Sequence, residues 1–284
     1  METVAPLIVI TGPTASGKTG LAIELAEKYG GEIVCADSRT IYRGMDIGTA
    51  KPTLDEQSRV PHHLLDVVDP GEKFSAANFQ ALANAAVDDI CSRGKVPFLV
   101  GGTGLYIDAV VREYVWPKTE GNPGELEGMT VDELKSMIEK QHKTMPENSL
   151  NKRHLINALL RSEQGSSLEK PSKNTYVVAI KTDKDILRSR IQERARDMFR
   201  TGVIDEARNL AERHGWSSEA MTGNIYPIIH RMLDGEISEE QAIAEFAAKD
   251  WQLAKRQLTW LKRFDYVKWL SLGDARVYIE TILG

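Results

Sequence analysis

The sequence predicts an α/β protein: a P-loop NTPase-like parallel sheet flanked by helices, with a helical insertion subdomain. Short apolar runs alternate with amphipathic stretches over the first hundred residues, which is typical of repeated strand–helix units. The motif GPTASGKT, residues 12–19, lies between one such run and the amphipathic stretch after it. That context is the one in which this glycine-rich motif forms a phosphate-binding loop.

The first strand and helix are predicted from residues 7–30. The apolar run LIVI, residues 7–10, leads directly into the phosphate loop. Leucines and alanines then recur at helical spacing over residues 19–30, and Gly30-Gly31 ends the pattern. A strand that enters a glycine-rich loop and a helix that leaves it are therefore expected here.

The next stretches repeat the alternation. Apolar runs predict strands at residues 33–36 and 97–104, and a short strand lies within 61–70, bracketed by prolines. Residues 74–95 are Ala-rich with helical periodicity, and Ser75 stands where an N-cap is expected. Alternating units of this kind form a parallel sheet whose ligand site lies at the carboxyl ends of the strands.

Three parts of the chain follow from changes in composition. Residues 1–112 form the first part of the P-loop core. Residues 113–174 are polar and helical, with Pro, Gly and Ser at their edges, and are expected to be an insertion. Residues 175–284 begin with the apolar, β-rich TYVVAIKTD, so they return to the sheet and then continue as helices.

Bulk composition is that of an ordinary globular protein. The 284 residues carry a formal net charge of −5, and only two cysteines occur, Cys35 and Cys91. They form no CxxC pair, so a disulfide framework or thiolate zinc site is not expected, and we expect a cytoplasmic location. No apolar run approaches the roughly 18 to 20 residues that a membrane span needs, so no membrane partner is expected. We expect a monomer.

The phosphate loop supplies the first candidate site. Its eight residues are expected to contribute backbone N–H groups, a lysine and a hydroxyl: Gly12, Pro13, Thr14, Ala15, Ser16, Gly17, Lys18 and Thr19. Lys18 would reach the outer phosphate oxygens and help to catalyse the reaction, while the Thr19 hydroxyl would bind Mg²⁺. A nucleotide hydrolase also needs a metal-binding acid after a later strand, but PFLVGGTG ends in glycines and a threonine. The acid occurs instead at Asp37, after the second strand, where it is better placed to take a proton from an acceptor.

One basic stretch stands out on an acidic protein. WQLAKRQLTWLKR, residues 251–263, carries Lys255, Arg256, Lys262 and Arg263 and no acidic residue. As a helix it would place the two basic pairs on one face, anchored by three leucines: Leu253, Leu258 and Leu261. Such a stretch is either a solvated helix face or a surface for nucleic acid.

Taken together, these stretches resemble the tRNA dimethylallyltransferases, also called tRNA isopentenyltransferases, of the bacterial type. The matching segments run in chain order: GPTASGKT, ADSRTIYRGMDIGTAKP, PHHLLDVVDP, FSAANF, VGGTGLYI, GEIS and QLAKRQLTWLKR. The second of them, residues 36–52, is far more specific than the phosphate loop. The weakest stretch is at about residues 112–175.

The resemblance implies a prenyl transfer. The loop would hold the diphosphate of dimethylallyl diphosphate, and the five-carbon group would pass to N6 of the adenosine next to the anticodon of tRNA, on its 3′ side. Asp37 corresponds to the general base, and Thr103 to the threonine near the leaving oxygen. The segment that holds the flipped-out adenine corresponds to Asp37, Ser38, Arg39 and Thr40. The basic helix would contact the tRNA backbone, and the insertion would be a tRNA-binding lid.

Three departures from the family pattern concern arginines. Arginines expected in the insertion and in an MRxxGYRQ segment are replaced by Asn157, Thr222 and Pro227. One expected shortly after GGTG is also not evident. Five arginines in LRSRIQERARDMFR are candidate substitutes, unless they form a solvated basic face: Arg188, Arg190, Arg194, Arg196 and Arg200.

Alternatives remain at this point. An isopentenyltransferase acting on free adenine nucleotides would share the fold, although the basic helix and the insertion favour a macromolecular acceptor. A small-molecule, ATP-binding kinase would explain the phosphate loop but not the segment at residues 36–52. The missing arginines are compatible with a catalytically weakened tRNA-binding homologue.

Overall fold

The computed structural model describes residues 5–118, 120–162, 165–172, 174–223 and 225–284. The chain divides into two compact units: unit 1, residues Met1–Arg112 and Lys170–Gly284, and unit 2, residues Glu113–Glu169. Unit 2 ends five residues before the boundary expected at residue 174.

Unit 1 is built on a six-stranded sheet in the order β3-β2-β4-β1-β5-β6, and every neighbouring pair is parallel. The predicted parallel sheet is confirmed. The strands are β1 (Leu7–Thr11), β2 (Glu32–Ala36), β3 (His62–His63), β4 (Pro97–Gly101), β5 (Thr175–Ile180) and β6 (Lys268–Leu270). β1, β2 and β4 are buried almost throughout, as expected for strands covered on both faces.

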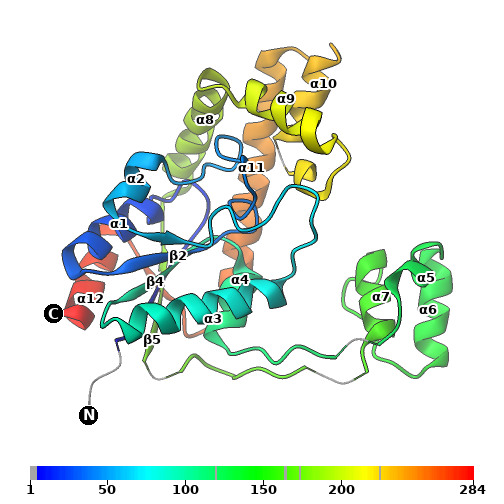
Figure 1. Ribbon diagram of the computed structural model, residues 1–284, viewed down its shortest axis with the longest axis horizontal. Helices are drawn as coiled ribbons and strands as arrows, with labels where there is room; N and C mark the ends of the chain where they lie inside the picture. The colour runs from blue at the N-terminus through cyan, green and yellow to red at the C-terminus, as the bar shows by residue number, and fades with distance from the viewer. Residues whose placement is uncertain (1–4, 119, 163–164, 173, 224) are drawn as a thin grey trace. The chain divides into compact units, whose positions relative to one another are not determined.

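Helices cover the two faces of this sheet (Figure 1). One apolar layer involves α1 (Lys18–Tyr29) and α12 (Leu272–Leu283), and the other involves α3 (Ala76–Ser92) and α4 (Gly104–Val111). Ser75 caps α3 as predicted, in a reciprocal capping box with Asn78. The short α2 (Leu54–Arg59) is capped in the same way by Thr53.

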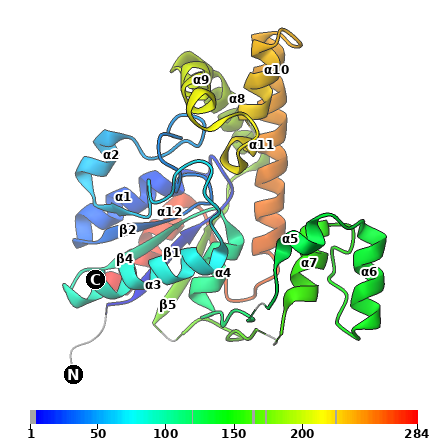
Figure 2. The same cartoon turned by 45° about the vertical axis from the view of Figure 1, so that its right-hand side comes forward.

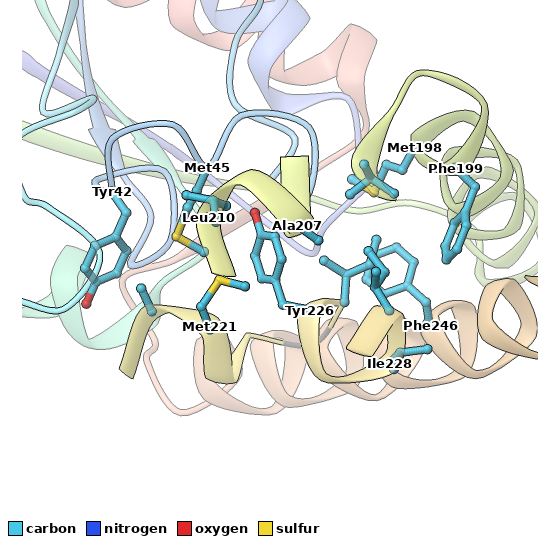
Figure 3. Close-up of a cluster of buried hydrophobic side chains, with 14 of the residues drawn as sticks. Tyr42, Met45, Met198, Phe199, Ala207, Leu210, Met221, Tyr226, Ile228 and Phe246 are labelled. Atoms are coloured by element: carbon cyan, nitrogen blue, oxygen red, sulfur yellow. The ribbon is translucent and has the colours of Figure 1, made fainter. Parts of the chain in front are cut away.

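A third apolar core lies away from the sheet and joins the loop after β2 to the C-terminal helices (Figure 3). The helices are α8 (Lys184–Arg200), α9 (Val203–His214), the 3₁₀ turn η1 (Glu219–Thr222), α10 (Tyr226–Leu233) and α11 (Glu239–Leu261). Ile41, Tyr42 and Met45 contribute from the loop, so the segment after β2 is packed against helices far along the chain. Figure 2 shows α8, α9, α10 and α11 as this separate helical layer.

The described residues of unit 2 form three short helices with a small core of their own. They are α5 (Pro123–Glu127), α6 (Val131–Lys140) and α7 (Lys152–Leu160). Leu134, Ile138 and Leu155 are completely buried in this core. An isolated bridge between Val115 and Ser166 pairs the two connecting segments antiparallel. The insertion is helical, as the composition predicted.

Several elements were missed by the sequence reasoning. The strand expected at residues 97–104 ends at Gly101, because α4 begins at Gly104, and the short α2 was not expected. β6 contains only three residues, and α12 follows it immediately, so neither stands out by periodicity alone. Among the described residues, no helix is both long enough and apolar enough to cross a membrane.

Candidate active site

The phosphate loop connects β1 to α1 and depends on glycine at two positions. Gly12 has φ 146° and Gly17 has φ 89°, a region that other residues rarely adopt. A Cβ on Gly12 would also lie 3.2 Å from the backbone nitrogen of Ile180 and 3.2 Å from Ser16 Oγ. Gly17 is the N-cap of α1, so the helix begins at Lys18 with its N-terminus towards the loop.

Lys18 and Ser16 are the polar groups that this loop turns inwards. Lys18 Nζ donates to the carbonyl of Pro13 at 3.3 Å. Burial lowers the pKa of Lys18 to about 8, while nearby Asp37 favours the charged form. The Ser16 hydroxyl is completely buried and has no hydrogen-bond partner in the described part of the chain. Ser16 lines neither of the two cavities at this loop, whereas Lys18 lines both of them.

Asp37 follows β2 and is held together with Thr103. The Arg39 backbone N–H donates to Asp37 Oδ1 at 2.8 Å, which fixes the carboxylate. The Thr103 hydroxyl accepts from the Ser38 backbone N–H at 3.0 Å, and its own N–H donates to the Ala36 carbonyl. The ends of β2 and β4 are therefore tied together, and the structure brings Asp37, Ser38 and Thr103 to one place.

The glycines at the end of β4 and just after it make this approach possible. A Cβ on Gly101 would lie 2.0 Å from the Ala36 carbonyl oxygen, and one on Gly102 would lie 2.4 Å from Gln257 Nε2. At Gly104 it would lie 2.2 Å from the Trp260 ring. The sequence GGTG is thus required by packing, and α11 lies directly against it.

Gln257 and Asp250 are two residues of α11 that the sequence reasoning missed. Gln257 accepts from the Thr14 N–H at 2.8 Å and donates to the Gly102 carbonyl at 3.1 Å, so it links the phosphate loop to the loop after β4. Asp250 is buried and pairs with Arg194 of α8. The basic residues of this helix indicated a function for its exposed face, whereas Gln257 and Asp250 are buried and contact the phosphate loop and Arg194.

Arg194 and Arg190 bring positive charge from α8 to the phosphate loop. Arg194 also donates to the Thr14 hydroxyl, and Arg190 donates to the carbonyl of Ala15 at 3.5 Å. Arg188 instead lies over the Trp251 ring, 5.7 Å from its centroid. Two of the five candidate substitute arginines therefore reach the loop.

Two cavities meet at these residues. The first, about 470 Å³, is lined by the phosphate loop, Asp37, Thr40, Arg190 and Arg194. The second, about 390 Å³, is lined by Asp37, Ser38, Arg39 and the loop after β4, together with side chains of α11. Their shared lining comprises Thr14, Lys18, Asp37, Thr49, Ala50 and Arg194. Thr40 lines only the first cavity, although the resemblance placed it with the acceptor.

The four basic residues at the end of α11 do not share one face. Arg256 lines the second cavity, whereas Lys255 lines a separate groove between α8 and α11. Lys262 is the C-cap of the helix, and Arg263 lies 5.0 Å from the centroid of the Trp260 ring. The expectation of one basic stripe was wrong because neighbouring residues on a helix point about 100° apart.

The expected anchoring of this helix was also wrong in part. Of the three predicted leucines only Leu261 is buried, while Leu253 and Leu258 are half-buried. Ala254 and Gln257 are the other buried positions in this part of the helix. Leu253 instead lines the second cavity, so an apolar residue there belongs to the site rather than to the core.

The three positions at which an expected family arginine is replaced lie outside the lining of the two cavities. Thr222 is exposed in η1 and donates to the Glu219 carbonyl, and Pro227 lies in the first turn of α10. Asn157 is exposed on α7 of unit 2. None of the three lines either of the two cavities.

A metal at this site would depend on the substrate as well as on the protein. No group of three or more His, Cys, Asp or Glu side chains that could hold a metal occurs among the described residues. Thr19 lines the first cavity beside Lys18. A hydroxyl together with diphosphate oxygens and water is a donor set that suits Mg²⁺, so the residues present fit the ion.

The neighbouring histidines of β3 contact different groups, and His62 also lines the first cavity. His62 Nδ1 lies 2.7 Å from the Val60 carbonyl, and His63 Nε2 lies 2.7 Å from Glu32. Burial lowers the pKa of His62. Their side chains are held by different partners, as expected for neighbours on a strand.

The fold and the loop define a P-loop α/β protein in which a phosphate-binding cavity adjoins a second cavity. The chain matches the family model described as IPP transferase over residues 40–264. It is 39% identical to a tRNA dimethylallyltransferase of Roseiflexus sp. (strain RS-1), over 98% of this chain and 97% of the relative. Identity to a tRNA dimethylallyltransferase of Geobacillus thermodenitrificans (strain NG80-2) is 37%, over 96% of this chain and 92% of that one.

A solved structure shows the same likeness. The full-length tRNA isopentenylpyrophosphate transferase of Bacillus halodurans aligns with a TM-score of 0.76 and 34% identity, covering 98% of this chain and 96% of that chain. The chain belongs to the tRNA dimethylallyltransferase (IPP transferase) family.

Proposed function

We propose that this protein transfers the dimethylallyl group of dimethylallyl diphosphate to N6 of the adenosine 3′-adjacent to the anticodon in tRNA, releasing diphosphate. The observation that carries the proposal is the meeting of two cavities at Lys18 and Asp37. The phosphate loop lines the first cavity, and α11 lines the second cavity with side chains that include Arg256. Family membership supports the choice of substrates.

The phosphate loop and α8 would bind the diphosphate. Lys18, Arg190 and Arg194 line the first cavity, and the N-terminus of α1 adds partial positive charge. These groups stabilise the negative charge that develops as the bond between the prenyl carbon and the diphosphate oxygen breaks. Mg²⁺, bound at Thr19 and the diphosphate, would neutralise further charge there.

The acceptor would enter the second cavity. An exocyclic amine is a poor nucleophile, so the attack of N6 on the prenyl carbon gains from removal of its proton. Asp37 lines both cavities, and its carboxylate is fixed by the Arg39 N–H, so we assign it as the base that receives that proton. The adenine must leave its stack to reach the carboxylate.

The tRNA surface would include α11 and unit 2. Arg256 lines the second cavity, and Lys255, Lys262 and Arg263 are exposed in the same part of the chain. We propose that unit 2 acts as a lid over the anticodon stem-loop. The protein would act as a monomer, because both cavities are formed by one chain, and in the cytoplasm, where its two free cysteines stay reduced.

The test is incubation with unmodified tRNA and dimethylallyl diphosphate, followed by mass spectrometry of the nucleosides. The expected product is an adenosine heavier by one dimethylallyl group, mapped next to the anticodon. AMP in place of tRNA tests the alternative of a free nucleotide acceptor. Binding of tRNA without product would indicate the catalytically weakened homologue.

A further inference from the structure

The segment between Asp37 and Pro52 forms part of the wall of both cavities and has little regular structure. Its residues form turns and one isolated bridge, between Tyr42 and Val68. Asp37 stands at its beginning, and Gly48, Thr49 and Ala50 near its end line the second cavity. A wall without a helix or a strand needs other groups to satisfy its backbone N–H groups.

The carboxylate of Glu206, on α9, accepts hydrogen bonds from the backbone N–H groups of three consecutive residues in this wall. Its Oε2 accepts from the N–H of Asp46 at 2.8 Å and of Ile47 at 2.7 Å. Its Oε1 accepts from the N–H of Gly48 at 2.8 Å and from the Tyr226 hydroxyl at 2.9 Å. One carboxylate thus makes four hydrogen bonds, and hydrogen bonds to a charged acceptor are stronger than neutral ones.

Tyr226 fixes the carboxylate from the other side. The ring is buried in the core that joins the loop to the helices (Figure 3). Burial and the neighbouring Glu206 carboxylate raise the pKa of Tyr226, so the hydroxyl stays a donor. Gly48 approaches so closely that a Cβ there would lie 2.6 Å from the Tyr226 oxygen.

Lys51 supplies a second anchor for this segment, and it shares Asp46 with Glu206. The buried ammonium group of Lys51 pairs with Asp46 and Asp66 at 2.6 Å each and donates to the Tyr42 carbonyl. Because Lys51 also binds Asp66 and the Tyr42 carbonyl, which Glu206 does not touch, loss of Glu206 would loosen residues 46–48 without releasing the whole segment.

We propose that Glu206 is a positioning residue for the acceptor: it fixes the turn at residues 46–48 and thereby the wall against which the adenine lies when it approaches Asp37. This inference rests on the proposed function, since it presumes that the second cavity receives the acceptor. Glu206 lines neither of the two cavities, so it acts through the backbone and not on the substrate.

The test compares Glu206→Gln with Tyr226→Phe and with Glu212→Gln, the same change at an exposed position of α9. Glu206→Gln should raise the KM for tRNA about tenfold, corresponding to roughly 1.4 kcal/mol. The KM for the prenyl diphosphate should change less than twofold. Tyr226 itself lines the second cavity, and Tyr226→Phe keeps its ring in place while removing the hydrogen bond to Glu206, so it should shift the tRNA KM in the same direction but less. Glu212→Gln should behave as the wild type.

Hydrogen exchange of the amides at residues 46–48 gives a readout that does not depend on activity. These three amides should exchange at least tenfold faster in Glu206→Gln, while the strand amides of β1 and β4 stay protected. Equal changes in both KM values, or unchanged exchange at 46–48 in folded protein, would overturn the proposal. A wild type that makes no prenylated product would instead contradict the proposed function, and the exchange experiment would remain decisive for the anchor.

Discussion

The charged groups nearest the meeting point of the two cavities divide between two tasks. Lys18, Arg190 and Arg194 lie with the phosphate loop, whereas Asp37 lies where the loop after β2 reaches both cavities. Cations stabilise a departing diphosphate, and a carboxylate takes a proton, so each task has its own group. Both Lys18 and Asp37 line the two cavities, and the negative charge of Asp37 opposes the lowering of the pKa of Lys18 by burial.

Replacement of Asp37 by Ala should abolish prenyl transfer and leave tRNA affinity nearly intact. The carboxylate acts on one proton, whereas affinity comes from many phosphate contacts. Loss of a general base costs about 10² to 10⁴ in rate. Single-turnover rates and tRNA binding by the same protein are the measurements. A variant that retains half of the wild-type rate would remove Asp37 from this role.

The pKa of Lys18 predicts a pH dependence of diphosphate binding. In the free protein the ammonium group is charged below about pH 8 and neutral above it. Since the diphosphate binds the charged form, affinity should be constant below pH 7 and fall about tenfold per pH unit above pH 8. Calorimetric titration with dimethylallyl diphosphate between pH 6.5 and 9.5 measures this. Lys18→Arg, which stays charged throughout, should bind with a flatter profile.

At the scale of elements, α11 contributes buried side chains to the phosphate site and exposed basic side chains to the proposed tRNA surface. Its inward side chains Asp250 and Gln257 hold Arg194 and the phosphate loop. Its outward basic residues lie on more than one side, with Arg256 at the second cavity and Lys255 in the groove against α8. One helix therefore links the proposed tRNA surface to the geometry of the loop.

Changing Lys255 and Lys262 together to Gln should weaken tRNA binding and flatten its salt dependence by up to about two units of slope. Each lysine that meets a phosphate releases about one counterion. Prenyl diphosphate binding should stay unchanged, because neither residue lines the first cavity. Lys249→Gln is the matched control, since Lys249 lies on the same helix but pairs with Glu245. A slope equal to that of the wild type would mean that both lysines face solvent in the complex.

The elements show what sequence periodicity can and cannot predict. The phosphate loop, the strands at β1, β2 and β4, and the capped α3 were predicted because each has a local signal in glycines, apolar runs or an N-cap. Long-range partners were not predicted. Glu206 and Gln257 lie in ordinary helical patterns, and only the fold brings them to loops more than 150 residues away in sequence.

At the scale of the whole molecule, the residues proposed to carry out the reaction belong to unit 1, and the insertion is unit 2. Among the residues that the structure describes, both cavities are lined by unit 1 only, and the sheet belongs to this unit. Unit 2 has its own core around Leu134, Ile138 and Leu155. Each unit therefore has an apolar interior of its own, and the phosphate site does not depend on side chains from unit 2.

Replacement of residues 116–165 by a short Gly-Ser linker should leave unit 1 folded. The backbones of Val115 and Ser166 exchange two hydrogen bonds, at 2.8 and 3.0 Å, so the cut ends are adjacent and a short loop can join them. Prenyl diphosphate affinity should stay within about twofold of the wild type. If unit 2 is the lid, tRNA affinity should fall by at least about tenfold, or roughly 1.4 kcal/mol. Circular dichroism and thermal unfolding check the fold, and titrations with each substrate check the two affinities. A deletion that binds tRNA as well as the full chain would leave α11 and the second cavity as the whole tRNA surface.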